Sequence, residues 1–410
     1  MFPSLKVLEV GGGLAGAFCC SHFVQFGSAV HKVENASGDW TRSVPASGRK
    51  NISALFACLN RGKRSIALDL DNDRHIPALL GLAGQFDLVV YDRCLLPSEE
   101  GMALRTKLIE AKAPSAVMCC ISAFGEKGPW AGRPGSEFIA QATSGYWRYV
   151  SGPSEEPLRV GAYVATVGTG IFAAQGIMAA FLKRARRSGG GDVVEVNLLQ
   201  SLLALKTHHI AGQYEPDSWV GTRATGATDE PQYGWRAGDG KHLVFSFAFG
   251  SGKADGWRDF CHAVGISDRV IDEQLAEGAL QTTGIGRAAH QLRSLYESYF
   301  KNFKADELVR LVREHDGTAS LYDDYDGLMG AHRATRHVFG SAGAADRQFT
   351  TVDIPWLLDK KPIHGENEVS DCGQHTIEAL RDLGFTGEQI RTITEQVRPD
   401  CGDVSVDSPP

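Results

Sequence analysis

The chain has 410 residues, of which 43% are hydrophobic and 22% charged, and its formal net charge is −7. This length allows two domains, because single hydrophobic cores rarely grow beyond ~250–300 residues. The acidic balance argues against a general nucleic-acid binder, which needs a basic face to displace phosphate counterions. No run of about 18 apolar residues is present, and the start MFPSLKVLEV lacks the pattern of a signal peptide. We therefore expect a globular cytoplasmic protein that binds neither nucleic acid nor membrane.

The first half of the sequence alternates predicted strands and helices. The strands are LKVLEV, AVHKVE, SIALDL, DLVVYD, AVMCCIS and DVVEVN, and helices are expected at 15–26, 75–83, 105–111, 170–187 and 198–214. Strands that alternate with helices predict a largely parallel sheet covered by helices. The fold class is therefore α/β, with a Rossmann-like large domain.

The residue composition changes near residue 220, where the polar, glycine-rich stretch GTRATGATDEPQYG precedes the predicted strand KHLVFSFAF and three short predicted helices. We expect a smaller α/β domain over 220–325, between a large-domain part at 1–215 and a C-terminal part at 330–400 that completes the large domain. The last residues, 401–410, have the composition of a disordered tail.

The nine cysteines include the adjacent pairs Cys19-Cys20 and Cys119-Cys120 and form no CxxC motif. Their spacing is typical of neither zinc nor redox sites. We expect buried thiols, no metal and no tightly bound cofactor.

The first strand runs into a glycine motif. Gly11, Gly13 and Gly16 match G-x-G-x-x-G, and Glu34 ends the second strand, where a ribose-binding acid would lie. The same glycines are needed wherever a strand turns sharply into a helix packed closely on its sheet. The motif therefore leaves both a dinucleotide site and a purely structural turn open.

Longer motifs decide between these readings. FACLNRGKRSIALDL (Phe56–Leu70), ISAFGEKGPWAGRPGSEFIAQATSG (Ile121–Gly145), the segment from Pro157 to Ser201 that begins PLRVGAYVATVGTG, and DCGQHTIEALRDLG (Asp371–Gly384) occur in this order. Together they closely resemble the class III CoA-transferases, the family of formyl-CoA transferase, crotonobetainyl-CoA:carnitine CoA-transferase and α-methylacyl-CoA racemase. The resemblance covers nearly the whole chain and favours a structural role for the glycine turn.

The resemblance implies an interlocked dimer and covalent chemistry. In the family an aspartate attacks the donor thioester, so that a carboxylate held away from water must act as nucleophile. In this sequence Thr166 stands where that aspartate is expected, and no Asp or Glu lies between Arg159 and Asp192. A threonine hydroxyl cannot form the acyl anhydride that the family uses.

Glu137 matches an acidic family position near the active site and is the candidate substitute. The structural alternative is that its carboxylate caps the helix FIAQATSG. Ser136 stands where the racemases have a histidine, so their acid/base pair is missing as well.

The expected CoA site also departs from the family. Relatives carry an E-N-F-R-P-G-like turn after the fourth strand, whereas this chain reads YDRCLLPSEE. Asp92, Glu99 and Glu100 would thus meet an approaching polyphosphate, as would Asp71 after the third strand, and like charges oppose such binding.

The remaining candidates for contact with CoA are two basic residues and a loop. Lys63 and Arg64 could bind CoA or organise the fold through ion pairs, and both readings stay open. Gly250 and Gly252, in FAFGSGKADGW, resemble a family loop that closes over intermediates, although a plain turn is an equal reading.

The resemblance and its departures together predict a non-catalytic, or pseudo-catalytic, subunit of a heteromeric class III CoA-transferase. A homologous catalytic subunit would be its partner and would bind most of the CoA thioester, which is a substrate. The expected reaction moves CoA from an acyl-CoA such as succinyl-CoA to a carboxylic acid, and family analogy suggests an arylsuccinate such as benzylsuccinate. A self-sufficient homodimer that uses Glu137 and a non-enzymatic scaffold are the alternatives.

Overall fold

A computed structural model describes residues 4–44, 52–70, 72–95, 98–147, 159–186, 190–214, 234–247, 255–276, 293–332, 339–343 and 348–396. The chain divides into two compact units. Unit 1 comprises Met1–Ser144, Ala162–Leu205 and Thr335–Pro410, and unit 2 comprises Gly145–Gly161 and Lys206–Ala334. Compared with the expected boundaries, unit 2 begins nearer to residue 205 and includes a second, earlier segment. The expected tail at 401–410 lies outside the described residues.

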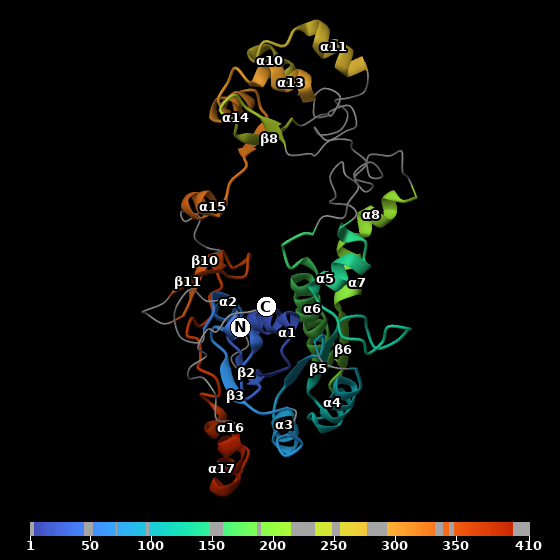
Figure 1. The fold of residues 1–410 in the computed structure, drawn as a ribbon, viewed down its shortest axis with the longest axis vertical. Coiled ribbons are helices and arrows are strands. Elements are labelled where there is room, and N and C mark those ends of the chain that lie inside the picture. Colours follow the sequence, from blue (N-terminus) through green and yellow to red (C-terminus); the bar gives the residue numbers. More distant parts are fainter. Residues whose placement is uncertain are drawn as a thin grey trace, which may run out of the picture. The chain divides into compact units, whose positions relative to one another are not determined.

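Unit 1 is built on a six-stranded parallel sheet in the order β3-β2-β1-β4-β5-β6 (Figure 1). This is the strand order of doubly wound nucleotide-binding folds. Its strands are β1 (Lys6–Val10), β2 (Ala29–Glu34), β3 (Arg64–Ala67), β4 (Leu88–Asp92), β5 (Val117–Ser122) and β6 (Val193–Asn197). β4 and β5 are buried along their whole length, as expected for strands covered on both faces. The expected α/β class and parallel sheet are confirmed.

Helices cover both faces of the sheet. α3 (Ile76–Ala83), α4 (Ser98–Ala111), α16 (Thr376–Asp382) and α17 (Gly387–Gln396) pack on one face around Leu79, Leu108 and Leu380. α1 (Leu14–Gln25) packs against α6 (Val164–Arg186), and α5 (Glu137–Thr143) and α7 (Leu198–Leu205) lie beside α6. α6 is long and apolar enough to cross a membrane, but half of its most apolar stretch is buried inside the protein. Such burial is typical of a core helix.

The remaining short elements of unit 1 connect these layers. They are the 3-10 helix η1 (Trp40–Ser43), the helix α2 (Ala54–Asn60), the antiparallel pair β10 (Phe339–Ala342) and β11 (Phe349–Val352), and the pair β12 (Leu357–Leu358) and β13 (Lys361–Pro362). Arg61, at the end of α2, forms an ion pair with Asp353 and donates to the side chain of Asn367. The C-terminal part of the chain is thereby tied to the N-terminal sheet.

Unit 2 has its own aromatic core. Its sheet pairs β7 (Trp235–Arg236), β8 (His242–Ser246) and β9 (Thr318–Leu321), all antiparallel. Its helices are α8 (Thr207–Gly212), α10 (Asp255–Ala263), α11 (Asp268–Ala276), α13 (Arg293–Phe300), α14 (Ala305–Glu314) and α15 (Tyr325–His332). Trp235, Phe245, Trp257 and Phe300 pack among them. The predicted helix over 198–214 is instead two helices, α7 and α8, which Lys206 separates.

A buried network of charges joins the first three strands of unit 1. Glu9 of β1 receives hydrogen bonds from the ammonium groups of Lys32 and Lys63, both at 2.6 Å, and Lys32 also pairs with Asp39 at 2.8 Å. Burial alone would raise the pKa of Glu9, but the two lysines outweigh it, so the pKa is lowered. The pKa of Asp39 is lowered in the same way by Lys32.

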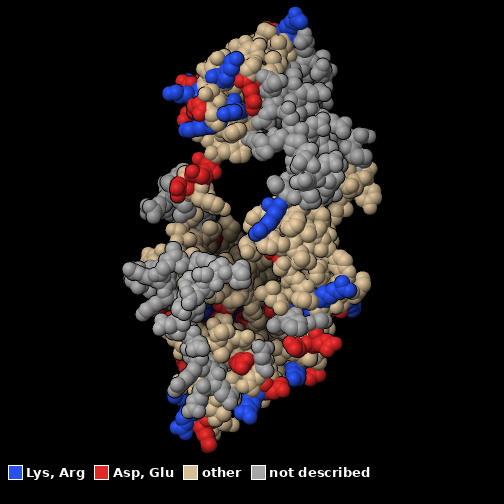
Figure 2. Space-filling view, viewed as in Figure 1, with Lys and Arg blue, Asp and Glu red and all other residues tan. Residues whose placement is uncertain are grey.

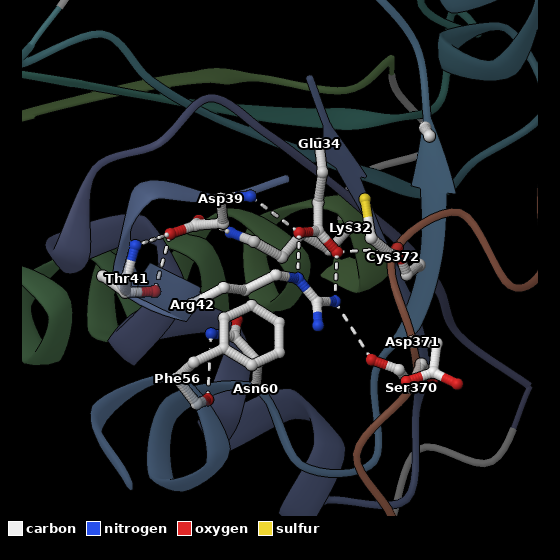
Figure 3. Close-up of polar contacts among 12 residues, drawn as sticks. Lys32, Glu34, Asp39, Thr41, Arg42, Phe56, Asn60, Ser370, Asp371 and Cys372 are labelled. Atoms are coloured by element: carbon white, nitrogen blue, oxygen red, sulfur yellow. Dashed lines mark hydrogen bonds and ion pairs between the residues drawn. The ribbon is translucent and has the colours of Figure 1, made fainter. Parts of the chain in front are cut away.

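A second part of the network reaches the C-terminal segment (Figure 3). Arg42 binds both carboxylate oxygens of Glu34 at 2.7 Å, and it donates to the carbonyl oxygen of Ser370. Glu34 also accepts from the Ser65 hydroxyl at 2.6 Å. Glu9, Glu34 and Asp39 thus balance Lys32, Lys63 and Arg42 within the interior.

Charges on the surface are distributed differently. In Figure 2 the described part of the visible face shows Lys and Arg interspersed with Asp and Glu. Many of the exposed ion pairs, such as Arg310 with Glu314, join side chains that solvent screens. The charges that matter most for folding are therefore those in the interior.

We predict that Glu9→Gln lowers the free energy of unfolding by about 3–5 kcal/mol, because it leaves buried lysines uncompensated. Urea unfolding monitored by circular dichroism measures this. The control is Glu378→Gln, which breaks the exposed pair with Arg64 and should change stability by about 0–1 kcal/mol. Because the pKa of Glu9 is lowered by folding, its contribution is present above the unfolded carboxyl pKa and is lost as the pH falls through the folded value. Equal effects of the two substitutions would contradict the assigned role.

Candidate functional site

The glycine turn after β1 packs around a single residue, Asp92, at the end of β4. A side-chain carbon at position 13 would lie 2.0 Å from the Asp92 carboxyl carbon, and one at position 16 would lie 2.8 Å from its Cβ. Gly11 has a φ of 102°, and a side chain there would lie 2.1 Å from the Asp92 carbonyl oxygen. The spacing of the motif therefore reflects close packing against β4.

The carboxylate of Asp92 occupies the amino end of α1. Its oxygens accept from the backbone N–H groups of Gly16 at 2.8 Å and Cys94 at 3.0 Å. Burial raises the pKa of Asp92, and the two N–H groups offset part of that rise. In a dinucleotide-binding protein this place belongs to the pyrophosphate. Here the carboxylate of Asp92 occupies that place. Glu34, the expected ribose-binding acid, forms an ion pair with Arg42. Both observations oppose a dinucleotide site.

Among the acids expected to face a polyphosphate, Asp92 is only 2% exposed, and its carboxylate is already bound by the backbone N–H groups of Gly16 and Cys94. Glu99 and Glu100 are exposed in the first turn of α4, where negative charge suits the helix dipole. Asp71 lies outside the described residues.

Glu137 is the first residue of α5, but it caps a different helix from the one expected. Its Oε1 accepts from the N–H of Ala165 at 2.9 Å and its Oε2 from the N–H of Thr166 at 2.7 Å, both in the first turn of α6. The Gln141 side chain donates to Oε1 at 2.6 Å. Glu137 is only 4% exposed, and its carboxylate is committed to the amino end of α6.

Thr166 therefore lies beside Glu137, in the same first turn of α6. It is 6% exposed and lines a pocket of about 320 Å³ together with Asp92 and Glu137. The pocket lies at the carboxyl ends of β1 and β4, where doubly wound folds bind their ligands. The structure thus brings the predicted nucleophile position and the candidate substitute into one cavity.

The walls of this pocket are mainly apolar and aromatic: Leu14, Trp40, Leu95, Phe138, Tyr163 and Leu198. Trp40 is held in place because its indole N–H donates to the carbonyl oxygen of Gly12 at 2.8 Å. It directly follows Asp39, which the buried Lys32 anchors. The sequence motifs did not indicate Trp40, since its neighbours in the pocket are distant in the chain.

Lys63 and Arg64 lie away from this pocket. The Lys63 ammonium is buried and donates to Glu9, Asn60 and the carbonyl oxygen of Ala17. Arg64 begins β3 and pairs with Glu378, so it lies at the opposite end of the parallel strands from the glycine turn. Their geometry favours the fold-organising reading over contact with CoA at this pocket. Gly250 and Gly252 lie outside the described residues.

This α/β fold, with an apolar pocket at the carboxyl ends of its strands, has the architecture of an enzyme that handles small organic substrates. The chain belongs to CoA-transferase family III, whose model matches residues 4–376.

The relatives in this family carry out CoA transfer. The chain is 32% identical to a succinate–glutarate CoA-transferase of Agrobacterium fabrum over 92% of this chain and 94% of the relative. It is 29% identical to a succinyl-CoA:mesaconate CoA-transferase of Haloarcula hispanica over 97% of this chain and 98% of the relative. A succinyl-CoA:glutarate CoA-transferase of Mus musculus is 33% identical, and that match spans 52% of this chain and half of the mouse protein.

Solved structures share the fold. A CAIB/BAIF family protein from Brucella suis superposes with a TM-score of 0.74 at 20% identity, covering 93% of this chain and 99% of that one. The orthorhombic form of Rv3272 from Mycobacterium tuberculosis gives a TM-score of 0.73 at 22% identity, covering 91% of this chain and 97% of that one.

We predict that Gly13→Ala destabilises the protein by about 1–3 kcal/mol, because its methyl group would overlap the Asp92 carboxylate. Gly12→Ala is the matched control, since a methyl group there meets only Trp40 at an ordinary 3.6 Å. In an Asp92→Ala background the cost of Gly13→Ala should shrink, which a double-mutant cycle of urea unfolding measures. An unchanged cost in that background would show that Asp92 is not what excludes a side chain at position 13.

Proposed function

We propose that this chain is a non-catalytic subunit of a heteromeric class III CoA-transferase. In the complex, CoA passes from succinyl-CoA to a carboxylic acid, and a homologous partner subunit supplies the aspartate nucleophile and most of the CoA contacts. The observation that carries the proposal is the pocket itself: it contains Thr166, where the family resemblance places the aspartate, and Asp92 and Glu137 already bind backbone N–H groups there.

The chemistry of these groups supports this reading. Forming an acyl anhydride requires a carboxylate whose oxygen can approach the thioester carbon. Both oxygens of Glu137 accept hydrogen bonds from the first turn of α6, so attack would uncap that helix. Asp92 accepts two backbone N–H groups in the same manner. Thr166 offers only a hydroxyl.

The relatives support succinyl-CoA as donor, because several are named for transfer between succinyl-CoA and another acid. The pocket walls favour an acceptor with an aromatic group, since Trp40, Phe138 and Tyr163 offer ring surfaces. An arylsuccinate such as benzylsuccinate combines such a ring with the dicarboxylic acid character of the relatives' substrates.

Exposed apolar side chains support a partner subunit. Ile139 of α5, Ile171 and Leu182 of α6, and Leu205 of α7 are each at least 40% exposed. The three helices contact one another, and contiguous apolar surface on neighbouring helices is typical of protein interfaces. We propose the cytoplasm as the compartment in which the complex acts.

Co-purification with a tag on this chain tests the proposal. We expect a near-stoichiometric homologous chain that carries the missing aspartate, and succinyl-CoA-dependent transfer to benzylsuccinate by the complex but not by this chain alone. Parallel assays with glutarate and mesaconate identify the acceptor class. A homodimer active alone would overturn the proposal in favour of a self-sufficient enzyme, and a homodimer inactive in every mixture would favour a scaffold.

Glu137→Gln distinguishes a cap from a nucleophile. The amide of Gln has one acceptor oxygen and one donor group, so it can accept from only one of the two backbone N–H groups of α6. We therefore expect the free energy of unfolding to fall by about 0.5–2 kcal/mol, as for other lost helix caps. CoA transfer by the complex, measured at a temperature where the variant stays folded, should persist. Abolished transfer by a folded variant with unchanged stability would instead identify Glu137 as the nucleophile.

A further inference from the structure

A second pocket lies at the other end of the sheet in unit 1. It has a volume of about 530 Å³ and is lined by residues at or near the amino ends of three strands, including Lys6 of β1, Ala29 of β2 and Arg64 of β3. The pocket with Thr166 follows the carboxyl end of β1, and β1, β2 and β3 are parallel. The two pockets are therefore at opposite ends of the strands.

His31 is a partly buried titratable group in the wall of the second pocket. Its Nδ1 is enclosed and has no hydrogen-bond partner among the described residues, and its ring stands edge-on to Phe86 at 5.1 Å between centroids. A buried N–H without a partner is rarer in proteins than a buried acceptor without one. We therefore assign the proton of the neutral ring to Nε2.

The charges around His31 are mostly positive. Burial is the main reason that its pKa is lowered to about 4; Arg64, His375 and Lys6 lower it further, and Glu378 opposes them. At neutral pH the ring is uncharged and offers a hydrogen-bond donor near the cations Lys6 and Arg64. This combination suits an anionic acceptor group.

The rest of the lining is divided between apolar and polar surface. Val24, Val30, Leu82 and Phe86 supply buried apolar surface. The charged lining residues, the carboxylates Glu366 and Asp382 and the cations Lys6 and Arg64, are all exposed, so solvent screens each of them. The ion pair of Arg64 with Glu378 is weak, because both side chains are about half exposed to solvent.

We propose that this pocket binds a small organic acid anion that carries an apolar group. The carboxylate accepts from Nε2 of His31 and is attracted by Lys6 and Arg64, while the apolar group packs on Leu82 and Phe86. The site is separate from the Thr166 pocket, so its occupant is an effector rather than the group that is transferred.

Benzoate is the probe, and benzyl alcohol is the uncharged control of similar size. The intact protein is labelled with ¹³C at histidine, the His31 signal is assigned with His31→Gln, and the imidazole shift is followed during titration. We expect benzoate to shift this signal saturably and to raise the His31 pKa above about 4, because a bound anion favours the protonated ring. Benzyl alcohol should bind far more weakly.

Lys6→Gln and Arg64→Gln should each weaken benzoate binding several-fold, and Lys183→Gln, at an exposed position of α6, should leave it unchanged. The proposal fails if no saturable shift is seen, if benzyl alcohol binds as tightly as benzoate, or if the Lys6 and Arg64 variants bind like the parent. Thermal unfolding of each variant verifies that the exposed substitutions leave the fold intact.

Discussion

The fold of unit 1 depends on Glu9, which lies between two buried lysines. Desolvation would make an unpaired carboxylate unfavourable at this buried position, and the same holds for either lysine without its partner. Together, Glu9, Lys32 and Lys63 fix β1 and β2 against the loop before β3, and Lys32 carries the connection on to Asp39. The next residue, Trp40, binds the carbonyl oxygen of Gly12 and forms one wall of the Thr166 pocket. The buried charges therefore determine where an aromatic wall of the candidate site lies.

A second constraint shapes the chemistry of that site. The helices α1 and α6 both begin at the pocket, and each obtains a carboxylate cap from a distant part of the chain: Asp92 of β4 for α1, and Glu137 of α5 for α6. Helix amino ends attract anions, so uncapped ends here would favour a phosphate or carboxylate ligand. With both ends already occupied by the chain's own acids, what the pocket offers a ligand is chiefly apolar surface. This is why an apolar group fits better than a polyphosphate.

The sequence predicted some of this and not the rest. Strands such as DLVVYD and AVMCCIS were recognisable because apolar runs between helices are typical of a buried parallel sheet. The glycine motif predicted a sharp turn. It did not predict that Asp92 occupies the space left by the absence of side chains at the glycines, because the two segments are about eighty residues apart. Lys63 left two readings open for the same reason: only the folded chain brings Glu9 to its ammonium. For Glu137 the structural alternative was a cap on its own helix, since nothing local indicates that α6 begins beside it.

The capping arrangement also bears on the proposal that this chain does without the family's nucleophile. Position 166 lies in the first turn of α6, where an acidic side chain would favour the helix through its dipole. The uncharged hydroxyl of Thr166 makes no such contribution. Glu137, however, binds the backbone N–H groups of Ala165 and Thr166 and supplies the negative charge from outside. The amino end of α6 therefore receives negative charge whichever side chain occupies position 166, and this supports the proposal that a carboxylate at that position is dispensable for the fold.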